Sequence, residues 1–271
     1  MISLVLTIHN KAFLLPEVIS GIKNNTVSNY EIIFIIDGCT DSSLQMVENF
    51  CKFNTKIKTQ IIECDNVFET KSNNIGLMKS IGDYCIIIQD DQIINQKGWD
   101  IEIKKPFINF TDVFAVSARC AHSWKLNPQS VDLYSKIFNG LNWCDSLHHF
   151  NHADKSNTAR DIFAVRDTVN RGPLAINRAD LETMGYLDEV YAPQGFDEHD
   201  LMYRMREKLG KVCGFYNIDW YSKPEYGGTR NEDGSTKKWM LEADWKNSKI
   251  FYERHKEAML LPAITENRIV K

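Results

Sequence analysis

The stretch YCIIIQDDQ, from Tyr84 to Gln92, decides how this chain is expected to fold. An uninterrupted apolar run of this kind is typical of a strand that is buried on both faces, as in a parallel sheet. The run ends in two adjacent acids, Asp90 and Asp91. Two carboxylates held close together repel each other, and their pKa values move apart. A protein tolerates this arrangement more readily where a cation lies between the two groups, so the strand end is a candidate ligand site.

The segments around this strand alternate between two patterns. Apolar runs rich in β-branched residues predict four strands, over residues 2–8, 31–37, 56–63 and 84–89. Helical spacing of apolar residues predicts three helices between them, over residues 14–25, 40–52 and 70–82. Strands that alternate with helices are typical of βαβ units with right-handed crossovers. The predicted fold class is therefore α/β, with a Rossmann-like, mostly parallel central sheet flanked by helices.

Polar residues follow three of the predicted strands. In open parallel sheets, ligands bind outside the carboxyl ends of the strands. The side chains that this rule places along one edge are Thr7, His9, Asn10, Asp37, Asp90 and Asp91. The sequence contains neither G-x-G-x-x-G nor G-x-x-x-x-G-K-[ST], so neither of these nucleotide-binding loops is expected.

Composition limits the class of protein and its setting. The chain has 271 residues, enough for one large α/β domain, and its formal net charge of −4 gives no general attraction to nucleic acid. The seven cysteines are scattered and form no C-x-x-C pair, which indicates free thiols in a reducing compartment. No secretory signal and no apolar run of about 20 residues is found. We therefore expect a cytoplasmic protein with, at most, a peripheral contact at the inner face of a membrane.

The second half of the chain has a weaker pattern. Residues 117–171 are polar and aromatic with little periodicity, which indicates a long irregular segment of the kind that often carries function. This segment includes Cys144 and three nearby histidines (His148, His149 and His152), but no second ligand pair at zinc spacing, so a histidine-rich loop is favoured over a zinc site.

Regular elements are expected again after residue 171. A strand and a short helix are predicted over residues 172–185, a helix over 196–210, a strand over 211–221 and a C-terminal helix near 241–255. The helix over 196–210 opens with Asp197, Glu198 and Asp200. Asp197 is a candidate N-cap, and acids at a helix start also suit its positive end, so a purely structural role for the three is as reasonable as a chemical one.

Five blocks of sequence, taken in order, resemble family 2 glycosyltransferases of the GT-A fold. The blocks are LTIHNK, IIDGCTDSS, NNIGLMKSIGDYCIIIQDDQ, GPLAINRADLETMGYLDE and DEHDLMYRMRE. The resemblance covers roughly residues 1–220. It implies a GT-A domain over residues 1–230, with a nucleotide-binding half over 1–116 and an acceptor half over 117–230, followed by a short helical tail over 231–271.

The resemblance also implies what the first half binds. The donor would be a nucleotide-diphosphate sugar, most often a UDP-sugar, held with Mn²⁺ or Mg²⁺. Asp91 corresponds to the metal ligand of the D-x-D-type element, in which Gln89 takes the place of the first acid. The residues that correspond to the nucleotide site are Thr7, His9, Asn10, Asp37, Asn73 and Asp90. Asn73 stands where relatives often have a basic residue, so contacts to the diphosphate are expected to come from elsewhere.

The resemblance assigns the chemistry to the DEHDL block. Glu198 stands at the place of the catalytic aspartate that takes the proton of the acceptor hydroxyl, and Asp197 is the alternative base. Arg171, Arg178 and Asp200 are candidate contacts to phosphate or acceptor. The implied reaction transfers the sugar with inversion to a hydroxyl of a glycan or glycolipid.

Three other functions remain open from the sequence. One is a nucleotidyltransferase, although the basic Gly-rich loop usual after the first strand of such enzymes is missing. Another is a glycoside hydrolase with two carboxylates flanking the bond. The last is a GT-A module that binds a sugar nucleotide or glycan without turnover, because a fold alone does not determine a function.

Overall fold

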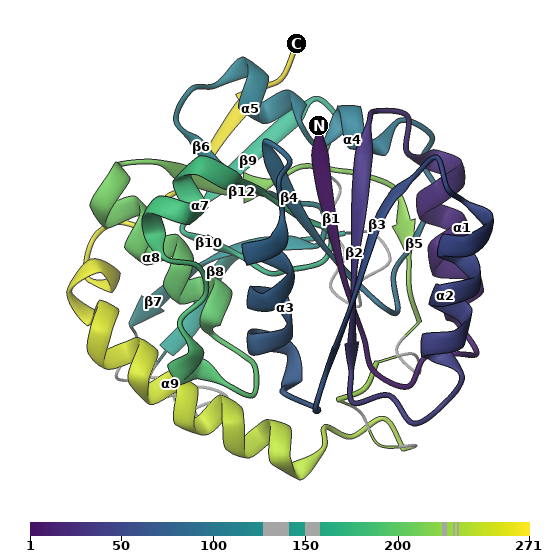
Figure 1. Cartoon of the computed structure of the whole chain (residues 1–271). Helices are drawn as coiled ribbons and strands as arrows, with labels where there is room; N and C mark the ends of the chain where they lie inside the picture. The colour runs from purple at the N-terminus through teal and green to yellow at the C-terminus, as the bar shows by residue number, and fades with distance from the viewer. Residues whose placement is uncertain (127–140, 150–157, 224–226, 230, 232) are drawn as a thin grey trace.

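The computed structural model describes residues 1–126, 141–149, 158–223, 227–229, 231 and 233–271, with the side chains of 125, 126 and 141–144 excepted. His152 and the side chain of Cys144, which belong to the histidine-rich segment, lie outside this range. The described chain is built on one large sheet whose strands lie in the order β14-β9-β12-β6-β11-β4-β1-β2-β3 (Figure 1).

The strands of this sheet are mostly parallel, as predicted. Their bounds are β1 (Ile2–Ile8), β2 (Tyr30–Asp37), β3 (Lys58–Cys64), β4 (Tyr84–Gln89), β6 (Val113–Ser117), β9 (Ile162–Arg166), β11 (Leu174–Asn177), β12 (Val212–Phe215) and β14 (Glu266–Ile269). β1, β2, β3 and β4 pair in parallel, and β11 runs antiparallel between β4 and β6. The carboxyl ends of β1, β2 and β4 therefore meet at one edge.

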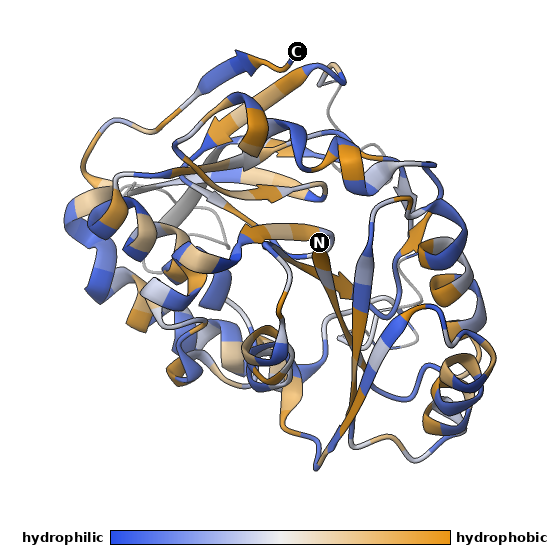
Figure 2. Cartoon of the chain, turned by 45° about the horizontal axis from the view of Figure 1, so that its top comes forward, coloured by the Kyte–Doolittle hydropathy of each residue, from blue (hydrophilic) through white to orange (hydrophobic). Residues whose placement is uncertain are grey.

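Helices cover both faces of the sheet. One face is packed by α1 (Leu15–Asn25), α2 (Ser43–Phe53) and α4 (Trp99–Glu102), with α5 (Lys105–Asn109) beside them, and the other by α3 (Phe68–Lys79), α7 (Arg178–Met184) and α8 (Asp197–Leu209). Each face has its own apolar core, and Figure 2 shows the hydrophobic strands between helices of mixed character. The four strands and three helices predicted over the first ninety residues are confirmed to within about three residues at each end.

The prediction of an irregular segment over residues 117–171 is wrong for its described part. This part contains β7 (Cys120–Leu126), β8 (Leu141–His148), β9 and β10 (Thr168–Val169), with β7, β8 and β10 forming a small antiparallel sheet. A further two-stranded sheet joins β5 (Ile93–Ile94) to β13 (Trp220–Tyr221). The alternation of apolar and polar residues fails in β7 because polar side chains are buried there, including His122 and Ser123.

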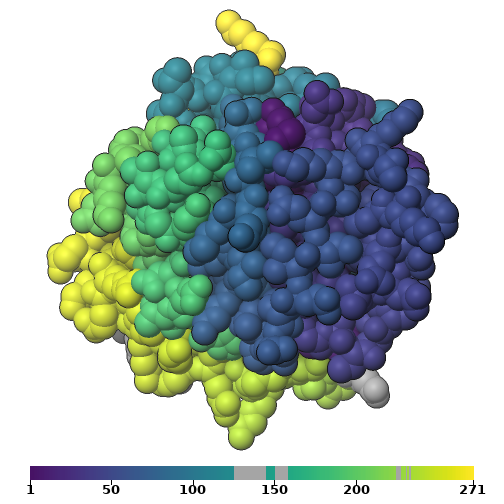
Figure 3. All heavy atoms as spheres, viewed as in Figure 1, coloured from purple at the N-terminus to yellow at the C-terminus, as the bar shows by residue number. Residues whose placement is uncertain are grey.

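The C-terminal segment is longer and more varied than a short helical tail. α9 (Lys238–Met259) packs on α8 through an aromatic cluster that includes Trp124, Phe196 and Phe251. Beyond it, β14 joins the central sheet beside β9. In the space-filling view the C-terminal residues (yellow) lie against the green residues of the second half (Figure 3). The domain boundary at residue 230 stays a prediction.

Candidate active site

The carboxyl edge of β1, β2 and β4 brings several predicted residues together. The backbone N–H of His9 donates to the Asp90 carboxylate at 2.9 Å, and the His9 ring nitrogen Nδ1 lies 2.6 Å from the Asp37 carbonyl oxygen. The Thr7 hydroxyl donates to the Asn73 side-chain oxygen at 3.2 Å. The His9 ring is exposed at this edge, and the contacts tie three parallel strands and α3 into one polar surface.

Asp90 and Asp91 differ in their surroundings. Partial burial raises the pKa of Asp90 to about 7, and the negative charges of Asp91 and Glu69 act in the same direction. Asp91 is half-buried, and its carboxylate has no hydrogen-bond or ion-pair partner among the described residues. A carboxylate at a strand end with its oxygens free is suited to a hard cation such as Mg²⁺ or Mn²⁺.

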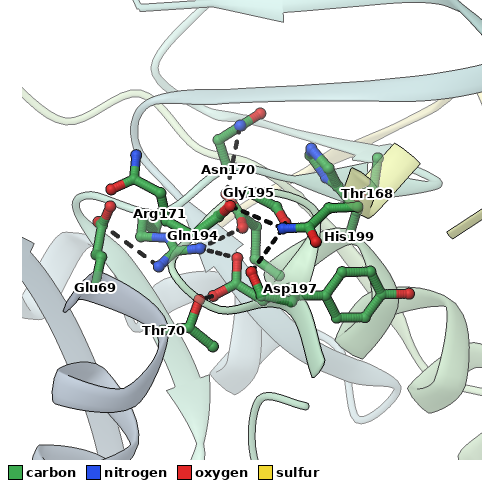
Figure 4. Close-up of polar contacts among 12 residues, drawn as sticks. Glu69, Thr70, Thr168, Asn170, Arg171, Gln194, Gly195, Asp197 and His199 are labelled. Atoms are coloured by element: carbon green, nitrogen blue, oxygen red, sulfur yellow. Dashed lines mark hydrogen bonds and ion pairs between the residues drawn. The ribbon is translucent and has the colours of Figure 1, made fainter. Parts of the chain in front are cut away.

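The second half contributes a pair of buried acids at the start of α8. Arg171 donates through Nη2 to both carboxylates, to Asp197 and, at 2.6 Å, to Glu198 (Figure 4). The Thr70 hydroxyl donates to the other oxygen of Asp197 at 2.8 Å. We call Asp197 and Glu198 the acid pair. The prediction that Asp197 is the N-cap of α8 is wrong. Phe196 occupies that position with a φ of 70°, and the Asp197 side chain faces Arg171 and Thr70 instead.

The two members of the acid pair have opposite pKa shifts. Burial raises the pKa of Asp197 well above its usual range, and the nearby charge of Glu198 adds to this effect. Burial also raises the pKa of Glu198, but Arg171 and a hydrogen bond from Asp197 outweigh it and bring the net pKa well below the usual range. Arg171 binds both acids, and the opposite directions of the two pKa shifts follow from how strongly each carboxyl group is stabilised beside it.

Glu69 connects the acid pair to the strand end of β4. Its carboxylate accepts a hydrogen bond from the Gln89 side-chain amide at 2.8 Å and lies 3.6 Å from Arg171 Nη1. The oxygen of the same Gln89 amide accepts a hydrogen bond from Arg119 at 2.9 Å. The chain of contacts from Gln89 through Glu69 and Arg171 to Asp197 therefore joins the candidate metal edge to the candidate base.

Three predicted site residues, Asn10, Arg178 and Asp200, direct their side chains to partners outside the candidate site. The Asn10 side-chain oxygen accepts from the backbone of Thr40 and Asp41 and so organises the loop before α2. Arg178 donates to the Gly82 carbonyl and pairs with Glu182, at the opposite end of β4 from Asp91. The structure does not bring Arg178 to the candidate site.

Asp200 lies away from the acid pair, among side chains of α9. It accepts hydrogen bonds from the Tyr191 hydroxyl at 3.1 Å and from Arg204 at 2.6 Å, and lies 2.9 Å from His255 Nε2. Burial raises the pKa of Asp200, but His255 and Arg204 outweigh it and bring the pKa to about 2. Asp200 is therefore placed to hold α8 against α9.

Sequence reasoning missed several residues that the structure places in the site: Glu69, Thr70, Arg119 and Asn170. The Asn170 amide lies 3.5 Å from the Glu198 oxygen Oε1. Arg119 is half-buried and has no carboxylate partner within the described part of the chain. An arginine such as Arg119, with no ion pair to a described residue and beside a predicted phosphate site, indicates a phosphate contact. The sequence alone could not show this, because Arg119 comes near Gln89 only through the position of β6 in the sheet.

The comparisons with known proteins agree with this fold. Residues 3–165, more than half of the chain, match the model of the glycosyl transferase family 2. The chain belongs to this family.

Curated relatives match over the first part of the chain. An uncharacterized glycosyltransferase of Haemophilus influenzae is 32% identical over 98 residues, covering 36% of this chain and 39% of the relative. Glycosyltransferase GlyG of Streptococcus pneumoniae is 28% identical over 97 residues, covering 35% of this chain and 32% of the relative. The matched region thus spans about a third to two fifths of these relatives.

Solved structures share the fold over most of the chain. GalNAc-T7 with UDP, GalNAc and Mn²⁺ has a TM-score of 0.65 at 14% identity, covering 97% of this chain and 52% of that one. The Pyrobaculum calidifontis mannosyltransferase PcManGT with GDP-Man and Mn²⁺ has a TM-score of 0.55 at 15% identity, covering 80% of this chain and 55% of that one. S. aureus TarS residues 1–349 with UDP-GlcNAc has a TM-score of 0.53 at 13% identity, covering 82% and 58%. At these identities the likeness shows the GT-A fold.

Proposed function

We propose that this chain is a metal-dependent, inverting glycosyltransferase that moves a sugar from a nucleotide-diphosphate sugar, most often a UDP-sugar, to a hydroxyl of a glycan or glycolipid. The observation that carries the proposal is the network from Gln89 through Glu69 and Arg171 to Asp197. It holds the strand end that suits a cation and the acids that suit a base within one connected set of side chains.

Glu198 is the better candidate for the base. The base must be ionised to accept the proton of the acceptor hydroxyl. The pKa of Glu198 is lowered by Arg171, which favours its ionised form, and its oxygen Oε1 has only a 3.5 Å contact to Asn170. Asp197 has a raised pKa, and both of its oxygens are occupied, by Thr70 and by Arg171. Asp197 therefore supports Glu198 rather than replacing it.

The proposed reaction is a single displacement. The acceptor oxygen attacks the anomeric carbon while Glu198 takes the hydroxyl proton, the bond from that carbon to the diphosphate oxygen breaks, and the nucleoside diphosphate leaves with the bonding electrons. Attack opposite the leaving group inverts the anomeric configuration. Thr7, His9 and Asp90 form the surface for the nucleoside in this proposal. Asp37 supports this surface from below, since its carboxylate is buried and accepts a hydrogen bond from the Val67 backbone N–H at 2.6 Å.

The residues at the β4 edge fit a divalent cation. Asp91 would hold it, with Asp90 beside it. Among the described residues no group of three or more His, Cys, Asp or Glu side chains is arranged to hold a metal ion. This agrees with a site completed by phosphate oxygens, since Mg²⁺ commonly binds through one or two carboxylates and the substrate's phosphates. When bound, the cation neutralises charge on the departing diphosphate.

Arg119 is the candidate for the second positive contact to the diphosphate. Its guanidinium donates to the side chain of Gln89, the residue before Asp90 and Asp91. No helix within the described residues is long and apolar enough to cross a bilayer. Separately from that finding, we propose that a glycolipid acceptor would be reached through a peripheral contact at the cytoplasmic face of a membrane.

A thermal-shift panel tests the proposal. UDP, GDP, UDP-GlcNAc and GDP-mannose would be added with and without Mn²⁺ to the wild type, to Asp91→Asn and to Asp65→Asn, an exposed acid after β3 that serves as a matched control. A ligand that binds only the folded state raises the melting temperature. We expect one nucleotide to stabilise the wild type and the control in a Mn²⁺-dependent manner, and Asp91→Asn to lose the shift.

The other functions predict different results. Nucleotide binding without sugar transfer to any acceptor would indicate a module without turnover. No shift with any nucleotide would contradict the assignment of the metal and the diphosphate. The hydrolase alternative is disfavoured for the acid pair, because Asp197 and Glu198 both bind Nη2 of Arg171, so a guanidinium lies between the two carboxyl groups where a hydrolase would place the glycosidic bond.

A further inference from the structure

α9 lies along the segment that leads into the acid pair. The loop after the 3-10 helix η1 (Glu189–Tyr191) runs to Phe196 and then directly into Asp197. Lys246 of α9 donates to the carbonyls of Val190 and Ala192 at 3.1 and 3.3 Å. This helix lies beyond residues 3–165, which match the family model.

Asn247 makes the most concentrated set of contacts from α9. Its side-chain nitrogen donates to the carbonyl oxygens of Tyr191 at 2.6 Å, Gln194 at 2.9 Å and Gly195 at 3.0 Å. Figure 4 labels two of these acceptor residues, Gln194 and Gly195, beside Asp197. The side chain is fully buried, and its oxygen has no hydrogen-bond partner among the described residues. Because all three neighbours are acceptors, the amide must turn its two N–H groups toward the loop.

The loop that Asn247 binds has a backbone that needs support. Gly195 has a φ of +91° and Phe196 has a φ of 70°, values that are costly for residues with a side chain. A Cβ on Gly195 would lie 2.7 Å from the Asp244 carboxylate, so the loop and α9 are in close contact. Such conformations persist where the surroundings fix them.

We infer that Asn247 is a positioning residue for the acid pair. By binding three carbonyls between Tyr191 and Gly195, it fixes the turn that sets the first residues of α8, and hence the direction of the Asp197 and Glu198 side chains toward Arg171. The hydrogen bonds of Asn247 go to the loop carbonyls and not to the acid pair itself. The catalytic part of this inference rests on the proposed function, whereas the positioning itself can be measured in the free protein.

The test compares the near-isosteric Asn247→Asp and the smaller Asn247→Ala with the wild type by amide hydrogen exchange. Asp has nearly the same shape as Asn, but its carboxylate oxygens cannot donate to the three loop carbonyls. The variant therefore removes the hydrogen bonds while it keeps the packing. We expect the amides of residues 195–200 to exchange roughly tenfold faster or more in both variants, as the loss of net hydrogen bonds implies. The control is Ser248→Ala, the next residue of α9, which is equally buried but bonds only within its helix.

Activity supplies the second measurement. With the donor selected by the nucleotide panel, we expect kcat to fall about tenfold or more, while the affinity for UDP with Mn²⁺ and the donor KM change less than about twofold. Unchanged exchange at residues 195–200 in the folded Asn247→Ala protein would overturn the inference. So would exchange that rises equally over β1–β4, which would indicate global loosening. If no nucleotide binds at all, the proposed function fails, and the exchange data still decide the positioning.

Discussion

In the half proposed to bind the nucleotide, residues 1–116, the candidate side chains are held by neighbouring strands, whereas the acid pair is held by residues from distant parts of the chain. His9 contacts Asp90 across the adjacent strands β1 and β4. The acid pair depends on Thr70, on Arg171 and, through the loop, on Asn247. A substitution in the first half should therefore change binding, and one in the second half should change turnover or stability.

The largest expected effect is a loss of turnover in Glu198→Gln. It would show that the acid pair affects turnover and not nucleotide binding. The variant keeps the size of the side chain but removes the base, so turnover should fall by about 10²–10⁴-fold, the usual contribution of a general base. UDP affinity in the presence of Mn²⁺ should stay within about twofold, since the nucleotide surface is on the other half. Steady-state kinetics and calorimetry measure the two quantities. A full rate in Glu198→Gln together with a large loss in Asp197→Asn would assign the base to Asp197 instead.

Arg171→Met should give the next largest effect, on stability. Removing the guanidinium leaves the buried acid pair without its cation, and breaking a buried ion pair from one side costs about 3–5 kcal/mol. Arg178→Met, which removes a partly exposed pair with Glu182 and a hydrogen bond to the Gly82 carbonyl, should cost about 1–2 kcal/mol. Urea unfolding measures both. Adding Glu198→Gln to Arg171→Met should restore part of the loss, and equal losses in the two arginine variants would contradict the buried arrangement.

His199 gives the second half a pH dependence of its own. Burial lowers the pKa of His199 to about 4, and its Nδ1 lies 2.6 Å from the Thr168 hydroxyl. The unfolded chain binds a proton near pH 6.5, so this contribution to the free energy of unfolding is complete above that pH and is lost as the pH falls toward 4. At about 1.4 kcal/mol per pKa unit, the contribution is about 3 kcal/mol. His199→Gln should therefore flatten the wild-type curve between pH 6.5 and 4 in urea unfolding, and parallel curves would argue against a buried neutral imidazole.

The smallest effect would test where the division between the halves breaks down. Arg119 belongs to the second half but is proposed to bind the diphosphate. Arg119→Gln should weaken UDP binding roughly tenfold, because a hydrogen bond to a charged group contributes about 1.5 kcal/mol or more. Uridine, which lacks phosphate, should bind unchanged. The control is Arg160→Gln, which removes an exposed pair with Asp219. Equal UDP affinities for Arg119→Gln and the wild type would show that Arg119 does not contact the diphosphate and that other residues bind it.

The difference between the halves also explains how much the sequence predicted. In the first half, the hydrophobic periodicity and the polar residues at the strand ends are sufficient to predict the fold and the position of the site. Parallel strands bring their carboxyl ends together by geometry alone. His9, Asp37 and Asp90 therefore met as expected. Asn10 was placed at the right edge, but its side chain turns to the loop before α2.

In the second half, local pattern was not sufficient. The acids Asp197, Glu198 and Asp200 looked alike in sequence, yet two face Arg171 and one faces α9. What separates them is the 3.6-residue period of α8 combined with the position of α9, and the latter is a tertiary fact. Thr70 and Glu69 gave no signal, because their roles arise from contacts across more than a hundred residues.

The pairing of β14 with β9 influences the order in which parts of the protein can fold during synthesis. A chain that leaves the ribosome from its N-terminus can form β1–β4 and their helices long before α9 and β14 appear. Until then the edge of β9 is unpaired, and Trp124 and Phe196 lack the helix that covers them. The nascent protein is thus expected to acquire its nucleotide surface first and its supported acid pair last. A chain interrupted before α9 would be an aggregation-prone species that still carries an intact nucleotide surface.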